Sequence, residues 1–193
     1  MKASNLSWQD ALSRLKAGNQ RFINDKLNTE NVDTGRRQEL SAGQHPFAVI
    51  LGCADSRVVP ELVFDTGLGE LFTIRVAGNV ANSSTLASIE YAAAHLGTNL
   101  IVVLGHESCG AVTAAINGGD LGYNLNHLLM HIIPAMNASE DKSVNAVVKK
   151  NAELTAREII RRSPIIQEEA SKRELKVVSA YYNLASGKVD FFE

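Results

Sequence analysis

The sequence predicts an α/β domain with a mainly parallel central sheet, one antiparallel edge strand, flanking helices and an amino-terminal helical arm. Two continuous apolar runs, 47–51 and 100–104, have the composition of strands buried on both faces, and a glycine follows each. Segments with helical signals lie between and after them. Strands that alternate with helices are typical of parallel sheets. The 193 residues suffice for one such domain.

The arm is expected over residues 1–45, and the α/β domain over 46–193. Ser7, followed three residues later by Asp10, resembles the capping box that begins many helices. A second short helix is expected over 34–42. A stripe of apolar side chains recurs near helical spacing after Ser7, and either its own domain or a partner subunit must cover it. The stripe consists of Trp8, Leu12, Leu15 and Phe22.

The helices of the domain are delimited by residues that favour helix ends. Gly97 and the segment 117–119 are stop signals, and the polar stretch 137–142 separates two helical regions. Ser163 and Pro164 are typical of an N-cap and a first helical position. On these signals we expect helices at 83–96, 108–116, within 121–136, at 144–162 and from residue 164 onward.

Three further apolar segments complete the sheet. Residues 71–76, which lie between the two buried runs along the chain, are expected to form a strand. The turn at 185–187 separates 175–182 from 189–192, so these two segments are expected to pair as a hairpin. The hairpin adds the antiparallel edge strand.

Composition narrows the class of partner. Lys and Arg total 19 against 21 Asp and Glu, which argues against a nucleic acid or an anionic membrane held by bulk charge. No apolar run approaches the roughly 20 residues of a membrane span. Residues 1–10 lack the apolar core of a secretory signal, so we expect a cytoplasmic protein, or a periplasmic one if a signal peptide was removed before residue 1.

Three metal-ligand side chains follow the two buried strands. Cys53 follows the first run, and His106 and Cys109 follow the second. Sites in such sheets form beyond the carboxyl ends of the strands, so these side chains converge if the strands are neighbours. Cys, His and Cys suit Zn²⁺, and three ligands leave one position open, as in catalytic sites. The other histidines are expected at the surface or in the core: His45, His95, His127 and His131.

Asp55 and Arg57 adjoin this set. In extended backbone, residues two apart point to the same side, so Cys53, Asp55 and Arg57 can face one cavity. Asp55 can take the open metal position, or it can pair with Arg57 and leave that position to water. The alternative is a surface salt bridge of little consequence.

A zinc ion at this site predicts a reaction type. It would hold a hydroxide nucleophile near neutral pH. Two thiolates and one imidazole leave the site neutral before hydroxide binds, so its water should be less acidic than at a three-histidine site. Activity should therefore increase at alkaline pH, and a small uncharged electrophile is the expected target.

The paired motifs resemble those of the β-class carbonic anhydrases. They are Cys-Ala-Asp-Ser-Arg at 53–57 and His-Glu-Ser-Cys-Gly at 106–110. The resemblance extends over nearly the whole chain, through segments 18–22, 60–65, 75–79, 88–91 and 163–166. It implies one Zn²⁺ per chain on Cys53, His106 and Cys109, and reversible hydration of CO2 to bicarbonate and a proton by a zinc-bound hydroxide.

The resemblance also implies how the site opens and assembles. Asp55 pairs with Arg57 in an open form and becomes the fourth zinc ligand only in a closed form. Members that switch off through a second bicarbonate site carry a tryptophan beside the first strand. The only tryptophan here is Trp8, which favours the open form. The pocket lies at the interface of a homodimer, or a dimer of dimers, whose arms wrap the neighbouring subunit. Its matching positions are Gln44, which donates to substrate oxygen, the apolar wall Phe72, Ala77 and Tyr91, and Gly110.

Three alternatives remain open on the sequence. A hydrolase of carbonyl sulfide or carbon disulfide could use the same scaffold. A non-catalytic zinc module could stabilise a dimer, with Asp55 permanently on the metal. A redox protein could use Cys53 and Cys109 as a thiol pair, and it would hold no stoichiometric metal.

Overall fold

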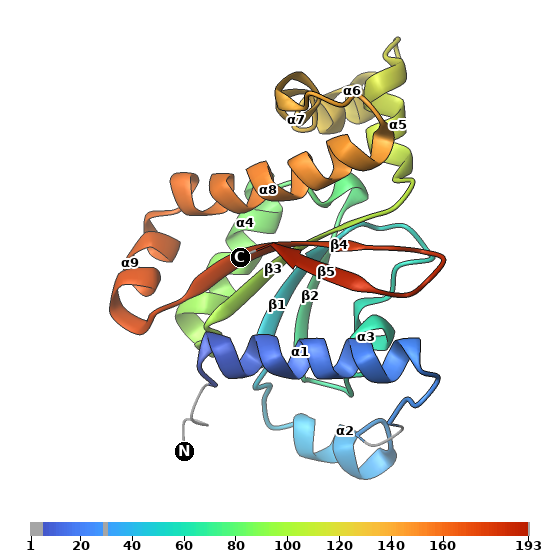
Figure 1. Cartoon of the computed structure of the whole chain (residues 1–193). Helices are drawn as coiled ribbons and strands as arrows, with labels where there is room; N and C mark the ends of the chain where they lie inside the picture. Colours follow the sequence, from blue (N-terminus) through green and yellow to red (C-terminus); the bar gives the residue numbers. More distant parts are fainter. Residues whose placement is uncertain (1–5, 29–30, 193) are drawn as a thin grey trace.

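The computed structural model describes residues 6–28 and 31–192, and one central sheet organises them (Figure 1). Within these residues five strands pair in the order β2-β1-β3-β4-β5. The pairs among β1 to β4 are parallel, and β5 is antiparallel to β4. The predicted mainly parallel sheet with one antiparallel edge is thus confirmed. The strands are β1 (Ala48–Gly52), β2 (Leu71–Arg75), β3 (Leu100–His106), β4 (Lys176–Tyr182) and β5 (Val189–Phe192).

The sequence leaves open which strands are neighbours in the sheet. The strand expected at 71–76 is present as β2, which lies at the edge of the sheet, beside β1 only. The two buried strands β1 and β3 pair directly with each other. Order along the chain does not determine order in a parallel sheet, because each crossover can return on either side of the preceding strand.

The central strands β1 and β3 are apolar because helices cover both faces of the sheet. Every residue of these two strands is buried. On one face Leu15 and Phe64 pack in a cluster with Ile50. On the other face Ile159 packs in a cluster with Leu51. Figure 1 shows the corresponding layers, with α1 on one side of the sheet and α8 on the other.

The helices begin close to the predicted positions. Ser143 and Ser163 are N-caps, and their hydroxyls accept hydrogen bonds from the backbone three residues later. The α-helices are α1 (Trp8–Ile23), α2 (Thr34–Leu40), α3 (Pro60–Val63), α4 (Ser83–Tyr91), α5 (Gly110–Asn117), α6 (Tyr123–Leu129), α7 (Ile133–Ala138), α8 (Val144–Arg162) and α9 (Pro164–Arg173). A 3-10 turn, η1 (Ala77–Asn79), and a π-helical turn, η2 (Ala92–Leu96), complete them.

Two predicted helical segments are divided in the structure. The segment 83–96 changes from α4 to the π-helical turn η2, where the backbone N–H and the hydroxyl of Thr98 both donate to the Ala92 carbonyl. The region 121–136 forms two short helices. Pro134 has no N–H and starts α7 instead of continuing α6. The short helix α3 and the turn η1 have no counterpart in the sequence prediction.

The amino-terminal helix α1 packs on its own domain. Ser7 is its N-cap and accepts a hydrogen bond from the Asp10 N–H at 3.1 Å. Leu12 and Leu15 are buried in the cluster that covers one face of the sheet, and Trp8 and Phe22 pack against it. The sequence left two alternatives for what buries the apolar stripe, the chain's own domain or a partner subunit. In the structure the stripe packs against its own domain.

One side chain of α1 also joins three distant segments. The Asn19 amide donates to the carbonyls of Val63 at 3.1 Å and Gly187 at 2.8 Å, and its oxygen accepts from the Val189 N–H at 2.9 Å. Asn19 is itself buried. It therefore ties α1 to α3, to the turn after β4 and to the edge strand β5.

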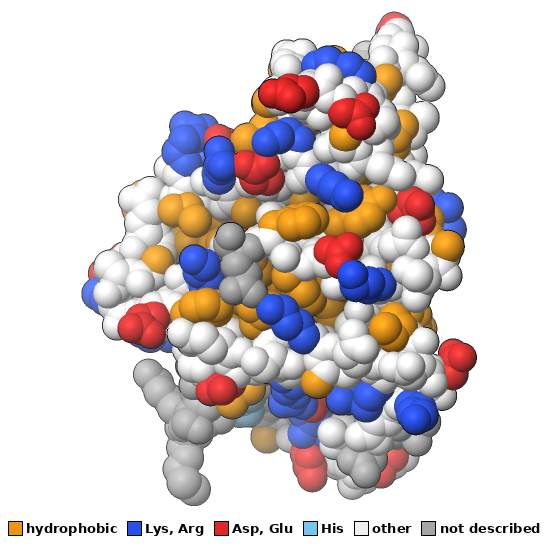
Figure 2. Space-filling view, in the orientation of Figure 1, with side chains coloured by type: hydrophobic (Ala, Val, Ile, Leu, Met, Phe, Trp, Pro, Cys, Tyr) orange, Lys and Arg blue, Asp and Glu red, His pale blue; other side chains and the backbone are white. Residues whose placement is uncertain are grey.

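The edge strand β5 borders an apolar surface. Figure 2 shows a band of hydrophobic side chains between α1 and α8, on the side where β5 lies. Phe192 of β5 is 41% exposed and lines a cavity of about 400 Å³ with Ala146 and Lys149. Among the described helices, none has the length and apolar composition to cross a membrane.

Candidate metal centre

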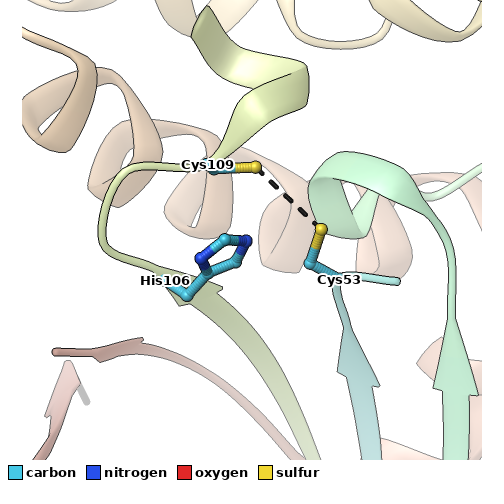
Figure 3. Close-up of side chains that lie close together, drawn as sticks. All are labelled: Cys53, His106 and Cys109. Atoms are coloured by element: carbon cyan, nitrogen blue, oxygen red, sulfur yellow. Dashed lines mark hydrogen bonds between the residues drawn. The ribbon is translucent and has the colours of Figure 1, made fainter. Parts of the chain in front are cut away.

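The three predicted ligand residues converge at the carboxyl ends of two neighbouring strands. Cys53 follows β1, His106 ends β3, and Cys109 is the N-cap residue of α5. We refer to them as the ligand cluster. Their side chains are buried, with 4%, 0% and 1% of the residue surface exposed. Their ligand atoms all lie within 4.8 Å of one another, and the two sulfur atoms are 4.0 Å apart (Figure 3).

The bend between β3 and α5 positions two of these ligands. β3 continues two residues beyond the predicted strand and therefore includes His106. Ser108 follows with a left-handed backbone (φ 53°), so α5 starts at Gly110 and not at residue 108. Asn145 of α8 accepts a hydrogen bond from the Ser108 N–H at 3.0 Å and stabilises the bend. Cys109 thereby faces Cys53 and His106.

The residues present fit a zinc ion. His106 Nδ1 lies 2.9 Å from the Glu107 carbonyl, so Nδ1 carries the proton and Nε2 has the free lone pair. His106 Nε2 is buried, and no hydrogen-bond partner for it exists among the described residues. Ligand atoms around tetrahedral zinc lie about 3.5–3.8 Å apart, so a small contraction of the cluster would seat the ion. Among the described residues, no other histidine belongs to a group of three metal ligands.

The contact between the two cysteine sulfurs shifts their pKa values in opposite directions. Cys109 donates a hydrogen bond to Cys53 Sγ, and this bond lowers the pKa of Cys53 although burial opposes the shift. His106 and the Gly78 N–H lower the pKa of Cys53 further. The same bond, together with burial, raises the pKa of Cys109. Both shifts favour Cys53 as the thiolate of the pair, and a metal bound by both sulfurs would displace the proton of Cys109.

A glycine that the sequence did not single out supports Cys53. The Gly78 N–H donates to Cys53 Sγ at 3.3 Å, and the Gly78 carbonyl accepts from the buried Asn151 amide at 2.8 Å. Gly78 has φ 69°, and a Cβ there would lie 2.8 Å from Ile132 Cδ1. Asn151 lies 73 residues away in α8, so no local sequence signal indicates this contact.

Asp55 and Arg57 form the predicted pair. Arg57 Nε and Nη2 donate to the two oxygens of Asp55 at 2.9 and 2.7 Å, and the Arg57 N–H adds a third bond at 3.0 Å. The guanidinium lowers the pKa of Asp55 well below its usual range. Asp55 Oδ2 lies 3.8 Å from His106 Nε2. The carboxylate therefore borders the ligand cluster while Arg57 holds it.

Arg75, at the end of β2, holds the backbone of this loop. Its guanidinium donates to the carbonyls of Cys53 at 3.0 Å and Asp55 at 2.7 Å. The sequence pattern indicates no role for Arg75, although the residue lies in a segment that matches the family.

The five expected pocket residues do not all lie beside the ligand cluster. Ala77 adjoins Gly78, and Gly110 adjoins Cys109. Phe72 and Tyr91 contact each other, with ring centroids 6.2 Å apart, and Tyr91 is 48% exposed. Gln44 precedes β1, whereas Cys53 follows it, so the strand separates Gln44 from the cluster of its own chain.

The family model and the relatives that match this chain agree on one family. The family model described as carbonic anhydrase matches residues 48–189. A protein of Mycobacterium tuberculosis named carbonic anhydrase 2 is 40% identical over 185 residues, which is 92% of this chain and 89% of the relative. A carbonic anhydrase of Mycolicibacterium smegmatis is 35% identical, over 93% and 91% of the two chains.

Solved structures agree in fold. A β-carbonic anhydrase of Aspergillus fumigatus has a TM-score of 0.75 at 26% identity, over 96% of this chain and 90% of that one. A β-carbonic anhydrase of Sordaria macrospora, described as tetrameric, has a TM-score of 0.76 at 24% identity and covers 95% of both chains.

Proposed function

Because this chain belongs to the β-class carbonic anhydrase family, we propose that it binds one zinc ion per chain and catalyses the reversible hydration of CO2 to bicarbonate and a proton. One observation carries the proposal. The unpartnered His106 Nε2 faces two cysteine sulfurs, and an arginine-held carboxylate borders the same point. Zinc, when bound, would act as a Lewis acid and lower the pKa of water.

Asp55 would orient the attacking water. Its lowered pKa keeps it ionised near neutral pH, so its Oδ2 accepts a hydrogen bond and does not donate one. Arg57 holds both carboxylate oxygens, which keeps Asp55 beside the ligand cluster. This arrangement matches the open form expected from the family. A zinc module with Asp55 as a permanent ligand would require Asp55 to exchange its hydrogen bonds with Arg57 for the metal.

The substrate pocket would be completed by a second copy of the chain. Gln44 precedes β1, at the end of the strand away from the ligand cluster, so Gln44 of the same chain is badly placed to donate to a substrate beside Cys53. The Phe72–Tyr91 pair, with Tyr91 half exposed, would supply an apolar wall for CO2 in the assembled enzyme. We therefore propose a homodimer or a dimer of dimers. The hydrophobic band in Figure 2 supports self-association.

Metal content and stopped-flow CO2 hydration test the function together. We expect about one zinc per chain, and CO2 turnover that disappears when zinc is removed by a chelator and returns when zinc is restored. Carbonyl sulfide and carbon disulfide serve as parallel substrates, and faster turnover of either would favour the hydrolase alternative. Stoichiometric zinc without turnover of any of these gases would indicate a structural module. Absence of bound metal, with a reversible Cys53–Cys109 disulfide, would indicate a redox protein.

A further inference from the structure

We propose a second binding site, for a phosphoryl group, in a groove lined by His127, His131 and Arg162. We refer to it as the basic groove. The residues come from α6, from the turn between α6 and α7, and from the last turn of α8. The basic groove uses no residue of the ligand cluster, so this proposal does not depend on the proposed function.

The basic groove consists of two adjoining cavities. The first has a volume of about 340 Å³ and is also lined by Asn82, Ser83 and Ser84. The second has a volume of about 360 Å³. His131 and Arg162 line both, so the cavities adjoin at these two side chains.

The basic groove carries positive charge that its own residues do not neutralise. Among its described lining residues Glu158 is the one carboxylate, and Arg161 engages both its oxygens at 2.8 and 2.7 Å. Within the described part of the chain, Arg162 forms no ion pair, and its guanidinium donates to the Ala81 carbonyl. The rings of His127 and His131 are 5.8 Å apart, with no described carboxylate at ion-pair distance. Glu158 is near enough for the charge of Arg162 to lower its pKa, but two arginines face this one carboxylate, so an anion would meet a net positive charge.

The acidity of His131 agrees with this charge. Burial lowers the pKa of His131, and the neighbouring charges of His127 and Arg162 lower it further. Other charged groups near the histidines are Arg161 and Glu158, which are paired with each other. A bound cation would increase the repulsion that acts on a protonated His131. A bound dianion would instead attract the protonated His131 ring and raise its pKa.

The opposite wall of the first cavity supplies neutral donors. Ser83 and Ser84 lie in the first turn of α4, where backbone N–H groups have no acceptor within the helix. Both residues are exposed beside the same cavity. Arginine, imidazole, hydroxyl and backbone N–H groups together are donors that phosphoryl oxygens accept.

The second cavity indicates room for an organic substituent. Met130, Pro134 and Leu154 give part of it an apolar lining. The phosphoryl group could therefore be free phosphate or the head of a small phosphomonoester. The shared chemistry is the dianionic group at Arg162, and the test below separates the two sources.

The test follows the His131 ring by NMR in the full-length, zinc-loaded protein. Inorganic phosphate is titrated at constant ionic strength, with chloride as the balancing salt. We expect saturable binding that raises the pKa of His131, and no such effect of chloride. An anion at the ligand cluster would affect His106 instead, so the readout separates the two sites. An equal shift in chloride alone would overturn the proposal.

Four substitutions give predictions of different sign. Arg162→Gln should weaken phosphate binding at least about tenfold, as expected for lost charge-assisted hydrogen bonds. Glu158→Gln removes the carboxylate of the groove and should tighten binding. Arg157→Gln, in the same helix but paired with Glu153 outside the groove, should leave binding unchanged. If Arg162→Gln does not fold, His131→Gln should still weaken binding.

Phenyl phosphate identifies the source of the phosphoryl group. Tighter binding than inorganic phosphate would support a phosphomonoester, and equal binding would support free phosphate. Wild-type affinity in Arg162→Gln or His131→Gln, or equal weakening by Arg157→Gln, would refute the basic groove as a specific site.

Discussion

Replacing Arg57 by alanine should separate metal binding from catalysis. The substitution removes the Nε and Nη2 hydrogen bonds to Asp55 and retains the backbone N–H bond to Oδ1. Asp55 Oδ2 then has no arginine partner and remains 3.8 Å from His106 Nε2. We expect the carboxylate to turn toward the metal and occupy the position that water needs.

The expected magnitude follows from the hydrogen bonds that the substitution removes. Two of the three hydrogen bonds from Arg57 to Asp55 disappear, while Cys53, His106 and Cys109 are unchanged. Zinc should therefore stay at about one per chain, and CO2 turnover should fall about 10- to 100-fold, the range typical of removing a partner group around a metal site. Arg57→Lys keeps the charge but not the two-pronged hydrogen bonding, so it should restore turnover only in part.

Arg161→Ala is the matched control for this experiment. Arg161 binds both oxygens of Glu158 at nearly the same distances, 2.8 and 2.7 Å, but it lies at the end of α8. It should retain both zinc and turnover. Stopped-flow hydration and metal analysis on the same preparations supply the measurements. Turnover of Arg57→Ala within about twofold of wild type, or loss of its zinc, would refute the positioning role, because partners around a metal usually have larger effects.

Three further predictions concern the metal, the pH profile and the amino-terminal helix. Cys109→Ala should lose zinc and turnover together, since it removes one of three ligands, and full zinc retention by metal analysis would contradict the site. Turnover should rise between roughly pH 7 and 9, the range of zinc-activated water. The lowered pKa of Asp55 keeps its ion pair with Arg57 intact over this range, and the pair is lost only as pH falls below the usual carboxyl range. Titration of Asp55 therefore does not cause the rise, and Asp55→Asn should lower turnover without moving the inflection of the pH profile. In thermal unfolding, Gly18→Ala should cost at least about 1–3 kcal/mol, as overpacking does, because its Cβ would lie 1.8 Å from the Phe64 carbonyl oxygen. Gly35→Ala, whose nearest neighbouring atom is 3.5 Å away, should be neutral or stabilising.

The sequence predicts most of the sheet because burial on both faces leaves a local signal. Continuous apolar runs identify β1 and β3, and the pairing of these strands brings Cys53, His106 and Cys109 together. The turn between β4 and β5 predicts their hairpin. Asp55 and Arg57 are recognisable as a pair because they are two residues apart. These features depend on composition or short spacing.

Interactions between distant segments leave no such local signal. Asn151 contacts Gly78 across 73 residues, and its own neighbourhood is an ordinary amphipathic helix. The edge position of β2 depends on how the chain crosses over, which strand composition does not encode. The sequence likewise does not determine what packs against the apolar stripe of α1. Helical spacing shows that one face of the helix is apolar, but it does not show which surface contacts that face. Pro134, in contrast, does indicate the split between α6 and α7.

The hydrogen bonds of Asn19 have a consequence for how the chain folds after synthesis. The amide of Asn19 meets Gly187 across 168 residues, so two of its three partners do not exist until residues 187–189 have been made. Until then the apolar face of α1 can pack only on an incomplete sheet that lacks the edge strand β5. Interactions of such separation slow folding, and a nascent chain with an uncovered helix face is prone to aggregation. Loss of the carboxyl-terminal strand should therefore harm the amino-terminal helix first, at the opposite end of the sequence.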